Sequence, residues 1–113
     1  MEIFKTYSFD SAHFLPKVPE DHPCHNLHGH TYTVIITIRG EIDNSGFVLD
    51  FLELDKIVKP IVTLLDHSCL NTIIDNPTSE NLTLYFLDKL KELPISKIVV
   101  QETPKTGAIW SKT

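Results

Sequence analysis

Three histidines and one cysteine near the start of the chain have the spacing of a metal site. His28 and His30 flank Gly29, and Cys24 lies four positions before His28. Successive side chains of a strand point to opposite faces, so His28 and His30 would project to one side of a strand, with Gly29 leaving room for an ion. His13 is the best candidate for a third ligand, because a first strand paired with this one would bring its end alongside.

Three imidazoles with one vacant position are typical of a catalytic zinc site, whereas structural zinc sites are closed by four protein ligands. Imidazole ligands without an obligatory carboxylate favour zinc over iron or copper, although ligand type alone does not exclude those metals. We therefore expect a bound divalent ion, with Zn²⁺ preferred. The alternative is that these histidines are solvent-exposed loop residues.

Cys24 is a candidate general base or nucleophile, because a thiol near a dication and imidazoles ionises more readily than a free one. Two alternatives remain open at this stage. Cys24 could be a fourth zinc ligand that closes a structural site, or an inert thiol in a loop. The second cysteine, Cys69, lies between Ser68 and Leu70 and is expected to be buried filler.

Three acidic residues and one further histidine could take part in chemistry. Asp66 directly precedes His67, and a carboxylate beside an imidazole can orient it and stabilise its protonated form. Adjacent residues do not normally face each other, however, so a polar turn after a helix is the alternative. Glu102 lies on a predicted strand, where its two oxygens match the paired N–H donors of a pterin or guanine edge, or where it simply faces outward. Glu80 is explained by the dipole of a predicted helix.

The apolar periodicity indicates which elements position these residues. Alternation predicts strands over residues 3–10 and 30–39, and two closing strands over residues 97–103 and 108–112. The two closing strands are expected to be joined by a hairpin loop over residues 104–107, with Gly107 supplying a positive φ.

Helical spacing follows Asp50, which with Glu53 resembles a capping box, and continues to the residue before Asp66. Pro60 is expected to kink or divide this helix. A second helix is expected from the capping residues 76–80 to a stop at Pro94. The order β-β-α-α-β-β predicts an α+β fold, with an antiparallel four-stranded sheet and two helices on one face.

Composition limits the possible classes of protein. The 113 residues are expected to form a single domain, 1–113, and their 42% hydrophobic and 22% charged residues are ordinary for a soluble protein. No apolar run is long enough to span a bilayer, and no signal peptide is evident, so a cytoplasmic location with free thiols is expected. A net charge of −5 without clustered Lys or Arg argues against nucleic acid as a partner. The open edges of a four-stranded sheet predict a homo-oligomer.

The motifs together resemble the 6-pyruvoyltetrahydropterin synthase family of tunnelling-fold enzymes, and the resemblance extends over essentially the whole chain. It is carried by His13, the run Cys24–His30, Asp66-His67, Pro77-Thr78-Ser79-Glu80 and Gln101-Glu102-Thr103. Within that family the chain is most similar to bacterial 6-carboxytetrahydropterin synthases of queuosine (7-deazaguanine) biosynthesis.

The resemblance implies a subunit that trimerises into a barrel, with two trimers stacked as a hexamer and active sites at subunit interfaces. It implies a zinc-dependent lyase that converts 7,8-dihydroneopterin triphosphate into 6-carboxy-5,6,7,8-tetrahydropterin, with loss of triphosphate and acetaldehyde. The implied roles are zinc binding by His13, His28 and His30, and proton abstraction by Cys24 with Asp66 and His67 from another subunit. Glu102 is implied both to bind the pterin and to act as a catalytic residue in proton relay, with Glu80, Thr78 and Ser79 nearby.

Three alternatives to this reaction stay open. The product could be 6-pyruvoyltetrahydropterin, or the side chain could be cleaved to give 6-hydroxymethyldihydropterin. Cys24 argues against cleavage, because cleavage enzymes of the family often carry Glu in that region. The third alternative is a non-catalytic zinc-binding module with Cys24 as a ligand.

Overall fold

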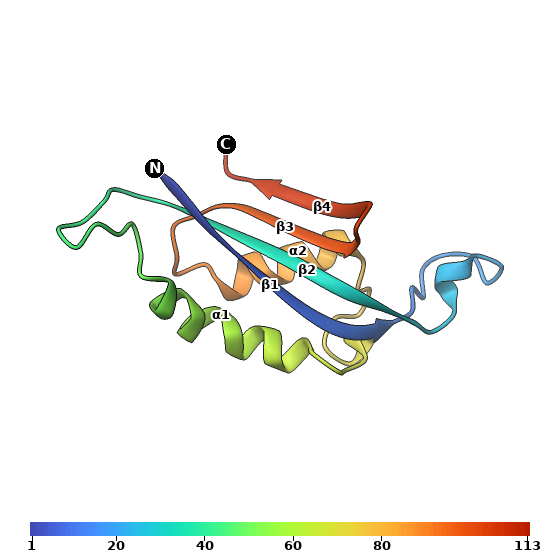
Figure 1. Ribbon diagram of the computed structural model, residues 1–113. Coiled ribbons are helices and arrows are strands. Elements are labelled where there is room, and N and C mark those ends of the chain that lie inside the picture. The colour runs from blue at the N-terminus through green and yellow to red at the C-terminus, as the bar shows by residue number, and fades with distance from the viewer.

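Four strands and two helices make up the computed structural model, which describes residues 1–113 (Figure 1). The elements are β1 (Glu2–His13), β2 (His28–Arg39), α1 (Phe51–Leu65), α2 (Ser79–Lys89), β3 (Ile95–Thr103) and β4 (Thr106–Ser111), with short 3-10 helices at Pro23–His25 and Leu70–Thr72. The sheet has the order β1-β2-β3-β4 and is antiparallel throughout. The predicted element order and fold class are therefore confirmed.

One face of the sheet is buried against the helices, and alternation along the strands decides which residues lie there. Sixteen buried hydrophobic residues form one cluster, to which the helices contribute Leu54, Val58, Leu82 and Phe86. On the first two strands its members are those that the periodicity predicts, Tyr7, Phe9, Tyr32, Val34, Ile36 and Ile38. Each fully buried aliphatic side chain contributes about 1.5–3 kcal/mol, so this face fixes the register of the sheet.

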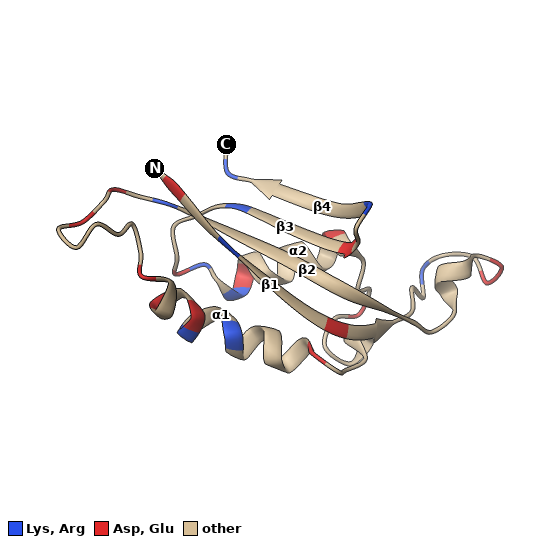
Figure 2. Ribbon diagram, viewed as in Figure 1, with Lys and Arg blue, Asp and Glu red and all other residues tan.

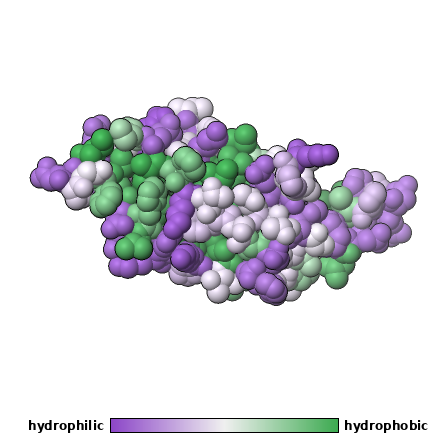
Figure 3. All heavy atoms as spheres, viewed as in Figure 1, coloured by the Kyte–Doolittle hydropathy of each residue, from purple (hydrophilic) through white to green (hydrophobic).

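The opposite face of the sheet carries no helix. The register aligns Thr6, Ile35, Val99 and Ile109 in one row across the four strands. Figure 3 shows surface of mixed polarity over the strands on this side. The row of three apolar residues and one threonine is more apolar than is usual for a sheet face that is exposed to solvent.

Helix α1 departs from the prediction in one respect. It begins after Asp50, whose side chain accepts a hydrogen bond from the Leu52 N–H at 2.9 Å, but it is not divided at Pro60. Pro60 is exposed, so the carbonyl that loses its partner can reach water. Not every apolar residue of the helix is buried, because Ile57 and Leu64 are 41% and 59% exposed.

The loop between β3 and β4 is shorter than predicted. Only Pro104 and Lys105 form the turn, and Gly107 lies within β4 without a positive φ. Its lack of a side chain is needed for a different reason, since a Cβ there would overlap the Val100 carbonyl oxygen and lie 2.9 Å from the Gln101 Cα. The expected role of this glycine is corrected from turn formation to close strand contact.

Charged side chains hold α1 against β1. Helix α1 carries charges of both signs over its first turns, and none over its C-terminal part (Figure 2). Asp55 accepts hydrogen bonds from Lys5 and from the Tyr7 hydroxyl, both at 2.7 Å. This contact fixes the N-terminal half of the helix relative to β1. No helix of the structure combines the length and apolar character that crossing a bilayer requires.

The segment after α1 covers part of the outer edge of β1. The Ala12 N–H donates to the Ser68 carbonyl at 2.9 Å, the His67 N–H donates to the Asp10 carbonyl at 2.6 Å, and Cys69 forms a parallel bridge with Ala12. Cys69 is therefore a half-buried edge residue rather than buried filler, and both cysteines are free thiols. The earlier part of this edge has no backbone hydrogen bonds to another segment.

Candidate functional site

The structure brings His13, His28 and His30 together at one end of the sheet. His13 is the last residue of β1 and lies directly opposite His28, the first residue of β2, while His30 lies two residues further on. Each histidine offers one ligand nitrogen, and the three nitrogens lie within 4.8 Å of one another. A cross-strand pair and a same-face neighbour thus supply the three imidazoles that the spacing predicted.

Backbone carbonyls fix the orientation of two of these rings. His13 Nδ1 lies 2.8 Å from the Pro77 oxygen, and His28 Nδ1 lies 2.7 Å from the Asn26 oxygen. A carbonyl can only accept, so both Nδ1 atoms carry the proton and both Nε2 atoms are left with a free lone pair. Metal-binding histidines are commonly held in this way.

The two Nε2 atoms of His13 and His28 face each other at 3.0 Å. Lone pairs at this separation repel unless a proton or a cation lies between them. Ligand nitrogens about 2.05 Å from a tetrahedral zinc ion are about 3.3 Å apart, which is close to this separation. The residues present therefore fit a metal ion held by three imidazoles.

Burial favours the neutral forms of His13 and His30. It is the main cause of the lowered pKa of His13 and of His30, against the opposing effect of the Glu102 carboxylate on both groups. A neutral imidazole is the form that coordinates a metal, so the lowered pKa of these two histidines favours metal binding at neutral pH.

Glu102 acts on the same cluster from β3. It is half-buried and shares the helix-facing side of its strand with Ile98 and Val100. Burial, together with the Glu102 charge, raises the pKa of Tyr32. The Tyr32 hydroxyl lies 3.2 Å from His13 Nδ1, and its ring stacks on Phe9 with the centroids 5.0 Å apart. Sequence reasoning did not single out Tyr32, although its position two residues after His30 placed it on the same face.

Cys24 lies in the loop that leads to this site. It belongs to the short helix Pro23–His25, is half-buried, and donates its N–H to His22 Nδ1 at 3.0 Å. The Leu15 N–H donates to the Cys24 carbonyl at 2.8 Å, which ties the loop to the end of β1. Its sulfur is not among the ligand atoms that converge within 4.8 Å. This arrangement favours a thiol outside the ligand set over a fourth ligand.

Asp66 and His67 face each other despite being adjacent in sequence. His67 Nδ1 lies 2.8 Å from one Asp66 oxygen, and the other oxygen accepts the Asp10 N–H at 2.9 Å. Adjacent residues do not normally face each other, but His67 has φ 53°, a left-handed conformation that turns its ring back toward Asp66. The Asp66 carboxylate raises the pKa of His67, while the Asp10 N–H and His67 lower the pKa of Asp66.

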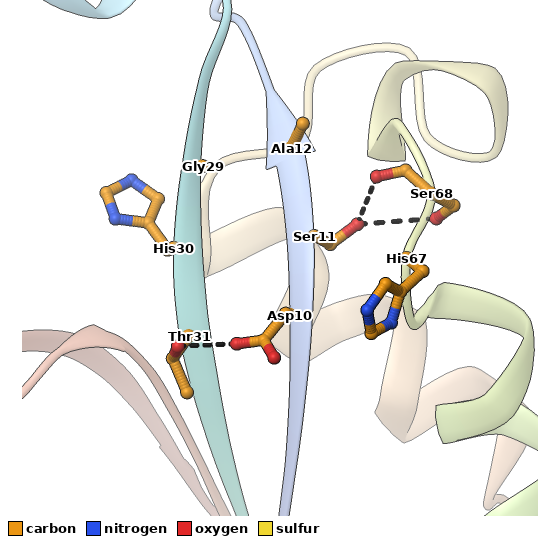
Figure 4. A pocket seen from close by; sticks show the side chains of 8 residues that line it. All are labelled: Asp10, Ser11, Ala12, Gly29, His30, Thr31, His67 and Ser68. Carbon is orange, nitrogen blue, oxygen red and sulfur yellow. Dashed lines mark hydrogen bonds between the residues drawn. The ribbon is translucent and has the colours of Figure 1, made fainter.

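Within one chain this pair does not meet the metal-binding histidines. The pocket drawn in Figure 4 has a volume of about 560 Å³. In this pocket His67 lies beside β1, next to Asp10, while His30 projects from β2 away from β1. The side chains of Asp66 and His67 hydrogen-bond to each other and to the Asp10 N–H, and Cys24 is not among their partners.

The predicted substrate-binding residues lie around the start of α2. Thr78 caps the helix by accepting the Asn81 N–H at 3.1 Å, and Ser79 is buried with no hydrogen-bond partner for its hydroxyl. Glu80 is exposed and lines an apolar groove of about 200 Å³ with Leu84 and Trp110 among its other residues. The link to the metal centre is Pro77, whose carbonyl binds His13.

Comparisons with known proteins agree on one family. Residues 2–112 match the family described as 6-pyruvoyl tetrahydropterin synthase. The chain is 46% identical over 88 residues to a dihydroneopterin monophosphate aldolase of Pyrococcus furiosus, covering 77% of this chain and 73% of the relative. It is 35% identical over 126 residues to the 6-carboxy-5,6,7,8-tetrahydropterin synthase of Bacillus subtilis, covering 96% and 84%. The structure of Caenorhabditis elegans 6-pyruvoyl tetrahydropterin synthase superposes with a TM-score of 0.88 at 28% identity, covering 100% of this chain and 96% of that one.

Proposed function

This chain belongs to the 6-pyruvoyl tetrahydropterin synthase family, and we propose that it is a zinc-dependent lyase acting on 7,8-dihydroneopterin triphosphate. Its products are 6-carboxy-5,6,7,8-tetrahydropterin, triphosphate and acetaldehyde, and the reaction belongs to queuosine (7-deazaguanine) biosynthesis. The similarity to the Bacillus subtilis enzyme over 96% of the chain supports this choice of reaction.

One observation carries the proposal. The Nε2 atoms of His13 and His28 converge beside His30, and the Cys24 sulfur stays outside this cluster. A three-histidine site leaves a position for substrate oxygens, and the thiol is then free to act on the substrate. A bound zinc ion would supply Lewis-acid polarisation of the substrate's side-chain hydroxyls.

Cys24 takes the proton from the substrate side chain, and His67 exchanges that proton with Cys24. Asp66 favours the protonated form of His67, since its carboxylate raises the pKa of the imidazole. A protonated His67 stabilises the thiolate and can return the proton later in the reaction. The Cys24 thiol is thus the base, and the Asp66-His67 pair accepts and returns the proton.

Glu102 binds the pterin ring through two parallel hydrogen bonds from the ring N–H groups. Its half-buried position on the metal-facing side of β3 supports this role. Exposed Glu80 and the capping residue Thr78 support a polar contact to substrate at the start of α2, with the buried Ser79 between them.

We further propose that residues 1–113 act as one domain in a hexamer built from two barrel-shaped trimers. Asp66 and His67 would then reach Cys24 of a neighbouring subunit, which explains their separation from the metal-binding histidines within one chain. The uncovered first part of β1 and the outer edge of β4 are available for pairing between copies. A barrel would also enclose the helix-free face with its row of Thr6, Ile35, Val99 and Ile109.

The test is to incubate the zinc-loaded protein with 7,8-dihydroneopterin triphosphate and to identify the products by mass spectrometry. The proposal expects a 6-carboxy product with an equivalent amount of acetaldehyde, and neither product from zinc-stripped protein. A 6-pyruvoyl product would reject it, as would binding of zinc without any turnover.

A second candidate function is side-chain cleavage to 6-hydroxymethyldihydropterin. The observation that favours it is the 46% identity to the Pyrococcus furiosus dihydroneopterin monophosphate aldolase. Incubation with dihydroneopterin monophosphate separates the two reactions, because cleavage gives a 6-hydroxymethyl product and our proposal gives none.

A further inference from the structure

We propose that Asp10 is a positioning residue that holds the Asp66-His67 pair in place and provides a second negative charge that keeps His67 protonated. This inference rests on the proposed proton-exchange role of His67. It assigns to the same site a residue of β1 that lies outside the family motifs considered above.

Asp10 contacts the pair through its backbone on both sides. Its N–H donates to Asp66 Oδ1 at 2.9 Å, and its carbonyl accepts the His67 N–H at 2.6 Å. Asp10 therefore binds both the Asp66 carboxylate, which orients the imidazole, and the backbone of His67. This pair of bonds holds His67 in its left-handed conformation, with φ 53°, which is costly for a residue other than glycine.

The Asp10 side chain is fixed separately, by Thr31. These two residues lie directly opposite each other on β1 and β2, and the Thr31 hydroxyl donates to Asp10 Oδ1. Figure 4 shows this bond on the side of the sheet where the His67 ring lies, with both side chains lining the same pocket. The carboxylate is thereby held facing the pocket that contains His67 instead of moving freely in solvent.

Within one chain, two carboxylates and no cation act on the His67 imidazole. Its raised pKa is caused first by the hydrogen bond to Asp66, then by the Asp66 charge, and also by the charge of Asp10. The His67 side chain is 79% exposed, so salt screens the Asp10 contribution more readily than the direct hydrogen bond. The charge of Asp10 and its backbone bonds are therefore separable by experiment.

The distinguishing variant is Asp10→Asn, because asparagine can still accept from Thr31 and keeps both backbone bonds while losing the charge. Glu92→Gln is the matched control, since it removes one negative charge from an exposed residue after α2. We would follow the His67 ring proton by NMR as a function of pH, with its signal identified by its absence in His67→Gln. Asp10→Glu tests whether restoring the negative charge restores the midpoint of the His67 titration.

The expected result is a lower midpoint of the His67 titration in Asp10→Asn, an unchanged midpoint in Glu92→Gln, and recovery toward the original midpoint in Asp10→Glu. In the enzyme assay, kcat of Asp10→Asn should fall about two- to threefold while KM stays unchanged, because the loss lies in proton exchange and not in binding and the exposed charge is partly screened. If Asp10→Asn fails to fold, Thr31→Val is used instead, which frees the carboxylate and should lower the midpoint by a smaller amount.

An unchanged midpoint in folded Asp10→Asn, or in Thr31→Val when that variant takes its place, overturns the inference. The titration needs no substrate, so its outcome is independent of the proposed reaction. A lowered midpoint in a protein that forms no 6-carboxy product would reject the function and leave the electrostatic role of Asp10 intact. Product formation with an unchanged midpoint would reject only the role of Asp10.

Discussion

Zinc should stabilise this protein strongly, and His28→Ala should abolish most of that stabilisation. His28 is half-buried and its Nε2 atom faces that of His13 at 3.0 Å. Replacing its ring removes one of three ligands without opening a cavity in the sixteen-residue core, of which His28 is not a member. The variant therefore separates metal binding from folding more cleanly than a substitution of the buried His13.

The magnitude follows from the linkage between binding and folding. Free zinc at about 100 times its Kd stabilises the folded state by about 2.7 kcal/mol. For a chain of 113 residues this corresponds to a rise in Tm of about 10 °C. If loss of one ligand weakens binding about 100-fold, the same zinc concentration gives about 0.4 kcal/mol, or about 2 °C.

Differential scanning calorimetry of chelator-stripped protein, with and without zinc, measures both shifts. His25→Ala is the matched control, because His25 is another half-buried histidine, three residues before β2, and lies outside the ligand cluster. It should retain the full shift of about 10 °C. The reasoning is refuted if His28→Ala keeps the full shift, or if His25→Ala loses it.

Three further predictions concern the thiol, the β3–β4 contact and the effect of pH. Cys24→Ala should keep its zinc-dependent rise in Tm while turnover, followed by mass spectrometry, falls at least about 100-fold; full turnover would contradict its role as base. Gly107→Ala should lower the free energy of unfolding by about 1–3 kcal/mol, because its Cβ would lie 2.9 Å from a backbone atom of β3. Urea unfolding measures this change, and an unchanged free energy of unfolding would contradict the contact. Burial lowers the pKa of His13 and His30, so the unfolded chain binds protons first, and metal-free stability should fall as pH drops through about 6.5. Urea midpoints at pH 7.5 and 5.5 test this in a His67→Gln background, which removes the histidine whose raised pKa acts oppositely; an increase at pH 5.5 would contradict it.

Much of the fold could be predicted because the strands obey a two-residue period. Buried Tyr32, Val34, Ile36 and Ile38 alternate with less buried residues, and burial of one face left a single register available. The predictions for Pro60 and Gly107 were wrong because proline and glycine each occur in more than one structural role. Pro60 sits on an exposed helix face where its lost hydrogen bond is replaced by water, and Gly107 is needed for strand approach and not for a turn. The family resemblance drawn from the motifs was confirmed by the match over residues 2–112.

The metal-binding trio could be predicted because its geometry is almost local. His28 and His30 share a strand face, and His13 needed only the pairing of β1 with β2. The surrounding contacts could not be predicted in the same way, since each joins distant segments. Pro77 reaches His13 across 64 positions of sequence, and Asp10 reaches Asp66 across 56. No periodicity or spacing rule encodes such contacts, which form only when the helices pack on the sheet.

The central claim is that three imidazoles hold zinc and leave one position for substrate, with the Cys24 sulfur outside the coordination shell. X-ray absorption at the zinc edge of the loaded protein tests it most directly. We predict a first shell of nitrogen and oxygen scatterers at about 2.0–2.1 Å and no sulfur. A sulfur scatterer at about 2.3 Å, or failure of the protein to retain zinc, would contradict the account.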